Sequence, residues 1–247
     1  MIGNRLRTAI VAFGLVGSAT AMAQEGQTLT EQGKMEQVIR DYLLSHPEVI
    51  VESIQRYQQQ QEQAAAAKQA TALVDLRDEL TRSPDSPVLG NPDGNVAVVE
   101  FFDYRCPYCK LMATRKLMET LEQDGNIRIV MKEFPILGED SMYAAKAALA
   151  AHRQGKYREL HMAMMLSKGK VTAEDVRRLA QEAGIDVGRM AKDMEAPEIA
   201  AEIGRNNDLA GKIGVTGTPA FVINDRLVPG AVEVSELMNL IAAARKQ

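Results

Sequence analysis

The placement of the two cysteines, Cys106 and Cys109, constrains this chain more than any other feature of its sequence. An almost uninterrupted apolar run at 96–103 precedes the pair, as expected of a strand that is buried on both faces. Residues 109–124 follow with helical periodicity, and a Gly-Asn pair ends that helix. The cysteines therefore fall where a buried strand gives way to a helix, which favours an α/β domain.

Cys106 is expected at the start of this helix. Unpaired backbone N–H groups and the positive end of the helix dipole favour a thiolate there, and the thiolate is the reactive form of cysteine. Cys109, one turn further on, can attack a mixed disulfide that Cys106 has formed. Pro107 suits the first helical turn and fixes the backbone between the thiols. The pair is thus predicted to cycle between dithiol and disulfide.

Two other interpretations of the cysteine pair are weaker. A zinc site would need two further ligands, and the three histidines, His46, His152 and His161, lie far from the pair in sequence. A purely structural disulfide would close so short a loop that it would remove little entropy from the unfolded chain. We therefore expect redox catalysis by the cysteines themselves, with no metal ion and no cofactor.

The remaining elements of the domain are predicted from apolar periodicity. Further strands are expected at 127–134, 220–224 and 226–228, with a tight turn at Asn224-Asp225. Further helices are expected at 139–153, 156–167, 172–183, 188–212 and 234–245. This order predicts an α/β domain at 87–247 with a helical insertion at about 138–212.

Residues 1–23 have the pattern of a cleaved signal peptide. Arg5 and Arg7 form a positive start, a short apolar run follows at 9–16, and Ala21-Met22-Ala23 supplies a small-x-small cleavage site. The apolar run is shorter than the roughly 20 residues that a membrane-spanning helix needs. The chain is therefore predicted to be exported to a bacterial periplasm, where disulfide chemistry is possible.

A long helical arm is predicted at 24–86, between the leader and the domain. Its helix runs from about residue 35 to 82, is interrupted at Ser45-His46-Pro47, and has a narrow apolar stripe that fades over 58–67. Residues 83–95 are expected to form a linker and a turn. Because the stripe must be buried somewhere, we favour self-association of identical helices over packing on the chain's own domain; the pattern does not give the oligomer number.

The charge balance argues against a nucleic-acid partner. The whole chain has a net charge of −4, and removal of the two leader arginines leaves −6 without any basic block. Neutralisation of phosphates needs clustered Lys and Arg.

Two stretches together resemble the thioredoxin-fold family, specifically the DsbA-like thiol–disulfide oxidoreductases. They are Val98–Cys109 and Val215–Phe221, and the resemblance extends over about 87–247 with the helical insertion. It implies that Cys106 is the nucleophile and Cys109 the resolving thiol, with Pro107 and Tyr108 tuning the redox pair. It also implies that Thr218 and a cis Pro219 form the loop opposite the thiols, where an extended client segment pairs as an added strand.

The same resemblance implies a role for Glu100, an acid inside the apolar strand six residues before the first cysteine. Charged groups are rarely buried without a partner or a role. In the family this position implies a proton relay to Cys109 during exchange. The alternative is a strand-end acid that reaches solvent.

The segment Asp41–Ile50 resembles the leading region of ScsC-type (suppressor of copper sensitivity) and Com1-like proteins, some of which use it to form trimers. The resemblance implies a homo-oligomer, with a trimer as one candidate state. Isomerisation needs a reduced attacking thiolate and prolonged client contact, so the arm favours a disulfide isomerase or reductase. The implied partners are disulfide-containing protein clients and a membrane redox partner that resets the cysteines.

Three rival functions stay open at this stage. One is a monomeric dithiol oxidase that a membrane partner reoxidises. Another is a copper(I)-binding or copper-tolerance protein, with Cys106 and Cys109 as better ligands than the methionines at 162, 164 and 165 beside His161. The third is a chaperone that holds clients in oligomeric arms and needs no thiols.

Overall fold

A computed structural model describes residues 30–246, so the predicted leader at 1–23 lies outside the described residues. The chain divides after Gln58 into two compact units. In the described part of the first unit, Thr30 caps α1 (Glu31–Ser45) by accepting a hydrogen bond from the Gly33 backbone N–H at 3.2 Å. α2 (Pro47–Asp75) begins one residue after His46, which confirms the predicted interruption. Over 30–246, none of the helices combines the length and apolar character needed to cross a membrane.

The apolar side chains of α1 and of the first part of α2 are exposed. Their exposed fractions range from 44% to 69%, and α1 has no buried residue. We expect an exposed apolar stripe of this length to be an interaction surface. We call the part of it that falls on one helical face the arm stripe; its residues are Met35, Val38, Ile39, Tyr42, Ile50, Ile54 and Tyr57.

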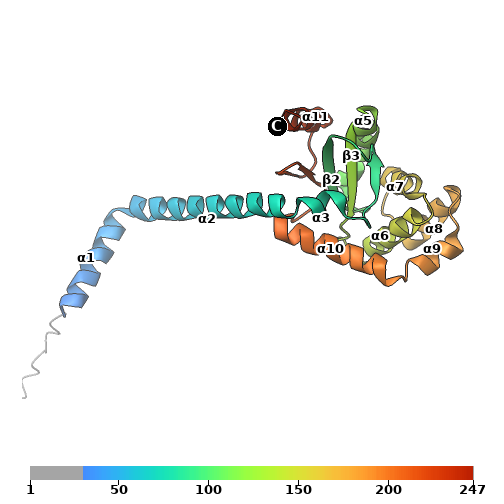
Figure 1. The fold of residues 1–247 in the computed structure, drawn as a ribbon. Helices are drawn as coiled ribbons and strands as arrows, with labels where there is room; N and C mark the ends of the chain where they lie inside the picture. The colour runs from blue at the N-terminus through green and yellow to red at the C-terminus, as the bar shows by residue number, and fades with distance from the viewer. Residues whose placement is uncertain (1–29, 247) are drawn as a thin grey trace, which may run out of the picture. The chain divides into compact units, whose positions relative to one another are not determined.

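The second unit is built on a five-stranded mixed sheet with the order β1-β3-β2-β4-β5. β2 and β3 are parallel and the other neighbouring pairs are antiparallel. This topology, with helices on both faces, is the predicted thioredoxin fold (Figure 1). The strand bounds are β1 (Val88–Gly90), β2 (Val96–Phe102), β3 (Ile127–Glu133), β4 (Ala220–Ile223) and β5 (Arg226–Pro229).

The helices of this unit follow the predicted order with two corrections. The helix expected at 109–124 is divided near Lys116, which adopts a left-handed conformation with φ of 60°. The helix expected at 188–212 is two helices, because Pro197 starts a new one and disfavours helical backbone before it. The bounds are α3 (Arg77–Arg82), α4 (Pro107–Thr114), α5 (Leu117–Gln123), α6 (Glu139–His152), α7 (Tyr157–Leu166), α8 (Ala173–Glu182), α9 (Val187–Asp193), α10 (Pro197–Ile213) and α11 (Val234–Ala244).

The two faces of the sheet have separate cores. Alternation along β2 directs Val98 and Phe102 into a core with α4 to α9 and α11. It directs Val99 and Phe101 into a second core with α10 and α3. One face thus carries the cysteine helix and most of the insertion, and the other carries α3 and the C-terminal part of α10.

The C-terminal part of α2 belongs to this second core. Leu73 is 2% exposed and, with Leu80 of α3, packs against Val99 and Phe101. The Gln69 side-chain amide donates a hydrogen bond of 2.9 Å to the Ile213 carbonyl at the end of α10. Part of the segment that the sequence assigns to the arm therefore stabilises the second unit.

Replacing Leu73 by Ala should lower the free energy of unfolding by about 2–5 kcal/mol, because a buried Leu leaves a cavity that cannot fully collapse. Its neighbour Val74 is 52% exposed, so Val74→Ala is the matched control and should change stability by less than about 0.5 kcal/mol. Denaturant unfolding of both variants measures the difference. Equal effects of the two substitutions would show that α2 does not pack on the sheet.

Candidate active site

The cysteine pair lies at the N-terminus of α4, on the edge where β2 ends. Cys106 is the N-cap residue, in extended conformation, and Pro107 is the first helical residue. Both cysteines are free thiols, and their residues are 4% and 2% exposed. The predicted strand-to-helix placement is confirmed.

Lys110 holds α4 against the C-terminal end of α7. Its Nζ donates to the carbonyls of Met164 and Ser167, at 2.8 and 2.9 Å, and to the Ser167 hydroxyl at 3.0 Å. A cation at the carbonyls of a helix end is favourable. The insertion thereby fixes the helix on which both thiols lie.

The pKa values of the two thiols are shifted in opposite directions. The pKa of Cys106 falls from 9.0 to about 5, chiefly because the Cys109 thiol donates a hydrogen bond to its sulfur. The Thr218 side chain and the backbone N–H groups of Tyr108 and Cys109 add to this effect, while burial opposes it. Burial, followed by that same hydrogen bond, raises the pKa of Cys109 far above its usual value. At neutral pH the arrangement presents one thiolate nucleophile with a protonated thiol behind it.

Thr218 and Pro219 lie directly opposite Cys106. The Cys106 thiol contacts the Thr218 carbonyl oxygen at 3.1 Å, and the peptide bond between Thr218 and Pro219 is cis. Pro219 immediately precedes β4, which pairs with β2. The sheet thus brings together two segments that are more than a hundred residues apart in sequence.

Glu100 lies in the middle of β2 and is 5% exposed, so it is not a strand-end acid that reaches solvent. Its cross-strand neighbours are Met131 and Phe221, neither of which is a cation. Burial raises its pKa from 4.5 to about 8. Glu100 and Cys109 line one small cavity of about 10 Å³, together with His161. A volume of this size has room for about one water molecule.

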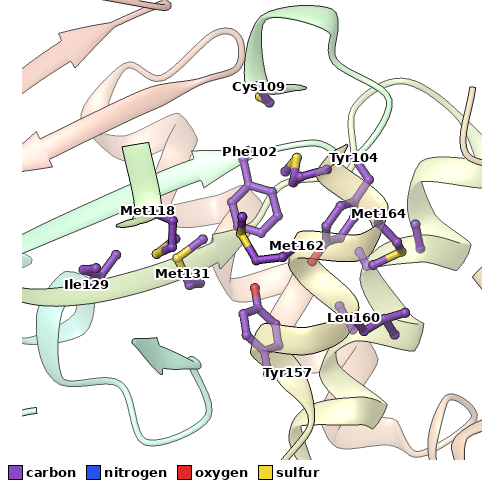
Figure 2. Close-up of a cluster of buried hydrophobic side chains, with 14 of the residues drawn as sticks. Phe102, Tyr104, Cys109, Met118, Ile129, Met131, Tyr157, Leu160, Met162 and Met164 are labelled. Atoms are coloured by element: carbon purple, nitrogen blue, oxygen red, sulfur yellow. The ribbon is translucent and has the colours of Figure 1, made fainter. Parts of the chain in front are cut away.

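A buried polar cluster next to this cavity was not predicted from the sequence. Tyr104 and Tyr157 each donate a hydrogen bond of 2.9 Å to one oxygen of Glu133, and the Tyr104 hydroxyl is 3.1 Å from Nδ1 of His161. Figure 2 shows both tyrosines among the apolar side chains between the sheet and α7. Glu133 could have been found by the argument used for Glu100, since it is also an acid in an apolar strand.

The proposed redox-tuning residues Pro107 and Tyr108 are exposed on the first turn of α4, and Tyr108 is 62% exposed. Other exposed apolar side chains lie on the elements next to this turn. Leu166 immediately precedes Ser167, which accepts a hydrogen bond from Lys110 of α4. The carbonyl of Leu137 accepts a hydrogen bond from Arg105, the residue before Cys106. We call this set the apolar rim; its residues are Tyr108, Leu111, Ile136, Leu137 and Leu166, with exposed fractions of 38% to 62%.

The methionines beside His161 are core residues. Met162, Met164 and Met165 are at most 9% exposed and fill the space between α7 and the sheet. Across residues 30–246, His, Cys, Asp and Glu side chains do not gather in threes at a geometry that would hold a metal ion.

The thiolate of Cys106 should titrate with a midpoint near pH 5. Because the pKa is lowered in the folded chain, the thiolate is fully present above about pH 7 and disappears as the pH falls through 5. Ultraviolet thiolate absorbance of the reduced protein measures this titration. The Cys106→Ser variant should lack the transition, and a midpoint near 9 would contradict the hydrogen-bonded thiolate.

Two parts of the chain match known family models. Residues 97–242 match the DSBA-like thioredoxin domain, and residues 31–64 match the N-terminal domain of the copper resistance protein ScsC. The first match covers more than half of the chain and includes both cysteines, Glu100 and the cis proline.

Solved structures and curated proteins agree with this placement. A thioredoxin-like oxidoreductase from Silicibacter pomeroyi is 50% identical, covering 69% of this chain and 98% of that one, with a TM-score of 0.65. The catalytic domain of Proteus mirabilis ScsC is 27% identical, covering 72% and 99%, with a TM-score of 0.66. A probable disulfide bond formation protein D of Bacillus anthracis is 29% identical over 56% of this chain and 70% of its own length.

The first curated relatives are Na(+)/H(+) antiporters of Salinispora, at 30% identity, and this chain spans only 24% and 25% of their length.

Proposed function

Because the chain belongs to the DSBA-like thioredoxin family, with an amino-terminal region of the ScsC type, we propose that it is a periplasmic disulfide isomerase or reductase of protein clients. It is a thiol–disulfide oxidoreductase by family; the direction, the compartment and the client class are the proposal. The observation that carries it is the Cys106 thiolate at the start of α4, backed by the Cys109 thiol and facing the Thr218-Pro219 loop.

In the proposed reaction, the Cys106 thiolate attacks one sulfur of a client disulfide. The client S–S bond breaks, its other sulfur leaves as a thiolate, and a mixed disulfide forms. In isomerisation, a second client thiolate then attacks the mixed disulfide and regenerates Cys106. In reduction, Cys109 loses its proton to Glu100 and attacks the Cys106 sulfur, so that the client leaves reduced and the Cys106–Cys109 disulfide forms. A membrane redox partner returns the pair to the dithiol.

Two surfaces support a protein client rather than a small thiol. The loop at Thr218 and Pro219 lies beside β4, where an extended segment can pair through its backbone. The apolar rim around α4 offers contact for the apolar segments that misfolded proteins expose. We assign client binding to these surfaces.

The arm stripe supports the proposed homo-oligomer. Its side chains are exposed in the single chain, and a second and third copy of the same helices would bury them. Such an assembly, a trimer being one candidate state, would let several Cys106 thiols act on one client at high effective concentration. The oligomerisation region and linker of this proposal are residues 24–86, before a domain at 87–247, except that Leu73 and Leu80 pack in the core of that domain.

A second candidate, a dithiol oxidase, is favoured by one observation. A thiolate with a pKa of about 5 stabilises the reduced form of Cys106, and stabilisation of the reduced form makes a disulfide more oxidising. A copper(I) protein is the third candidate, since the ScsC name is associated with copper resistance and two thiolates suit Cu(I). Titration of the reduced chain with Cu(I) and measurement of exchange activity distinguish these functions.

Mixing the reduced chain with an excess of a peptide that has one disulfide tests the exchange step and Glu100 together. We expect a first phase, proportional to peptide concentration, for attack by Cys106, and a second, concentration-independent phase for attack by Cys109. In Glu100→Gln the first phase should persist, and the second should slow by about 100-fold at pH 7, because a general base has been removed. In the wild type the second phase should be fastest above about pH 8, where Glu100 is a carboxylate. Equal second phases in both proteins would remove Glu100 from the mechanism.

A further inference from the structure

Asp103 is a buried acid between the end of β2 and the first cysteine, and the proposed reaction does not use its carboxylate. The residue is 1% exposed. Its backbone carbonyl accepts a hydrogen bond of 3.1 Å from the Cys106 N–H, which closes a four-residue turn. A backbone hydrogen bond also joins Asp103 to the Cys109 thiol. The backbone of Asp103 thus contacts the segment of both thiols, and its side chain is left for another role.

The two carboxylate oxygens of Asp103 bind different parts of the chain. Oδ1 accepts from the Arg105 backbone N–H at 2.7 Å, within the turn, and from the Ser141 hydroxyl at 2.8 Å. Oδ2 accepts from the backbone N–H groups of Ile136 and Leu137, at 2.9 and 3.0 Å. The first oxygen completes a turn in which Asp is common at this position. The second oxygen holds a loop that lies 33 and 34 residues further along the chain, which the turn does not require.

This loop, residues 135–138, follows β3 and carries two side chains of the apolar rim. Because β2 and β3 are parallel, the segments that follow them leave the same edge of the sheet. The Phe134 N–H extends the pairing by donating to the Phe102 carbonyl at 3.0 Å, and the loop comes next. Ile136 and Leu137 are 42% and 43% exposed. Asp103 therefore fixes their backbone while their side chains stay exposed beside the redox segment.

The Arg105 side chain holds the same loop through a different group. Its guanidinium donates to the Leu137 carbonyl at 3.2 Å and lies 3.5 Å from the Asp140 carboxylate. A carbonyl and two N–H groups of the loop are thus bound by residues 103 and 105, which belong to the turn that ends at Cys106. Loss of the Asp103 carboxylate would free the two N–H groups and let the loop move relative to the nucleophile.

We propose that Asp103 is a positioning residue of the client-binding surface: it holds Ile136 and Leu137 beside the nucleophile, and so sets a preference for disulfides with an apolar neighbour. A client sulfur in contact with Cys106 keeps its two neighbouring residues on either side within about 7 Å, since an extended chain rises roughly 3.5 Å per residue. An apolar client side chain there is removed from water against the rim, which favours attack. The inference rests on the proposed function, because it concerns how clients bind at that site.

Two peptides with one internal disulfide measure this preference. They are identical except that the residue before one cysteine is Leu in the first peptide and Ser in the second. The rate constant of the first phase, attack by Cys106, is measured for both, and their ratio is the selectivity. The same ratio measured with a small dithiol corrects for intrinsic reactivity. We expect the wild type to attack the Leu peptide about tenfold faster, the effect of burying part of a Leu side chain.

Asp103→Ser should lower the selectivity to less than about threefold, because the Leu side chain then loses most of its contact with the rim. The Ser hydroxyl can still accept from the Arg105 N–H, since Ser is also favoured at this turn position. It is too short to reach Ile136 and Leu137. Ser141→Ala is the matched control, because it removes one donor to Asp103 and leaves both hydrogen bonds to the loop. Its selectivity should differ from that of the wild type by less than about twofold.

The selectivity separates positioning from a loss of structure. A destabilised variant would slow attack on both peptides by the same factor, and their ratio would not change. Ile136→Ser combined with Leu137→Ser changes exposed side chains and should lower the ratio as Asp103→Ser does. Adding Asp103→Ser to this pair should lower it no further, because the same contact can be lost only once.

Amide hydrogen exchange of the wild type gives a readout that needs no variant. The amides of Ile136 and Leu137 should be protected although they lie in an exposed loop, because Oδ2 accepts from both. Unprotected amides would overturn the proposal. So would full selectivity in Asp103→Ser, an equal loss in Ser141→Ala, additive losses in the triple variant, or equal attack on both peptides by the wild type. A wild type that attacks neither peptide would instead overturn the proposed function.

Discussion

Replacing Cys106 by Ser should abolish disulfide exchange, with a loss of about 1,000-fold or more in the rate of client reduction or isomerisation. The reaction depends on a thiolate at this position, and the Ser hydroxyl does not ionise at neutral pH. The substitution removes one sulfur atom from the N-cap of α4, where the Cys106 side chain makes no capping hydrogen bond. The fold should therefore persist, and the far-ultraviolet circular dichroism should be unchanged.

Cys109→Ser is the matched control for this experiment. It also replaces a cysteine sulfur by oxygen, at the other end of the same Cys-Pro-Tyr-Cys motif. It should retain the first attack on a client and accumulate a mixed disulfide through Cys106, which a non-reducing gel detects. Accumulation in Cys106→Ser instead would reverse the assignment of nucleophile and resolving thiol. Persistent client refolding by both variants would favour a chaperone that needs no thiols.

Two acidic substitutions in the arm stripe, Ile39→Glu combined with Ile54→Glu, should dissociate the proposed oligomer. These side chains are 51% exposed in the single chain, and an assembly would transfer them into an apolar seam where a charge is costly. We expect light scattering to report monomers. Reactivation of scrambled ribonuclease should fall by about tenfold or more, since several thiols no longer act together on one client. Reduction of a peptide with one disulfide should not change.

Gln37→Glu combined with Gln55→Glu is the control for the arm experiment. Both glutamines are exposed on the same two helices and lie outside the arm stripe, so added charge there should leave the oligomer and the activity intact. Point substitutions are preferable to deletion of residues 24–82, because such a deletion would remove Leu73 and Leu80 from the second core. Monomers in the wild type would contradict the proposed role of the arm.

The local features of the site could be predicted from the sequence. The strand before Cys106, the helix after it and the interruption before Pro47 depend on residues that are neighbours in the chain, where apolar runs, prolines and caps act directly. The Thr218-Pro219 loop opposite the thiols was predicted from the family resemblance. Periodicity alone predicts only an ordinary turn there.

The features that were not predicted depend on tertiary contacts. β1 has only three residues and lies among Pro, Gly and Asn residues, so its pairing with β3 has no local signal. The periodicity of α2 places Leu73 on the apolar stripe of the helix. It does not tell whether a second copy of the chain or the chain's own sheet covers this residue. The link between His161 and Glu133 requires a strand, a loop and the insertion to meet, and spacing along the chain contains no information on that meeting.

The measurement that tests the account most directly is the reactivation of scrambled ribonuclease by the reduced chain, compared with the oxidation of reduced ribonuclease by its disulfide form. The account predicts that the reduced chain restores activity well above a small-thiol background and that the arm double variant loses this ability. Rapid oxidation by the disulfide form, without any reactivation by the reduced form, would contradict an isomerase and identify a dithiol oxidase.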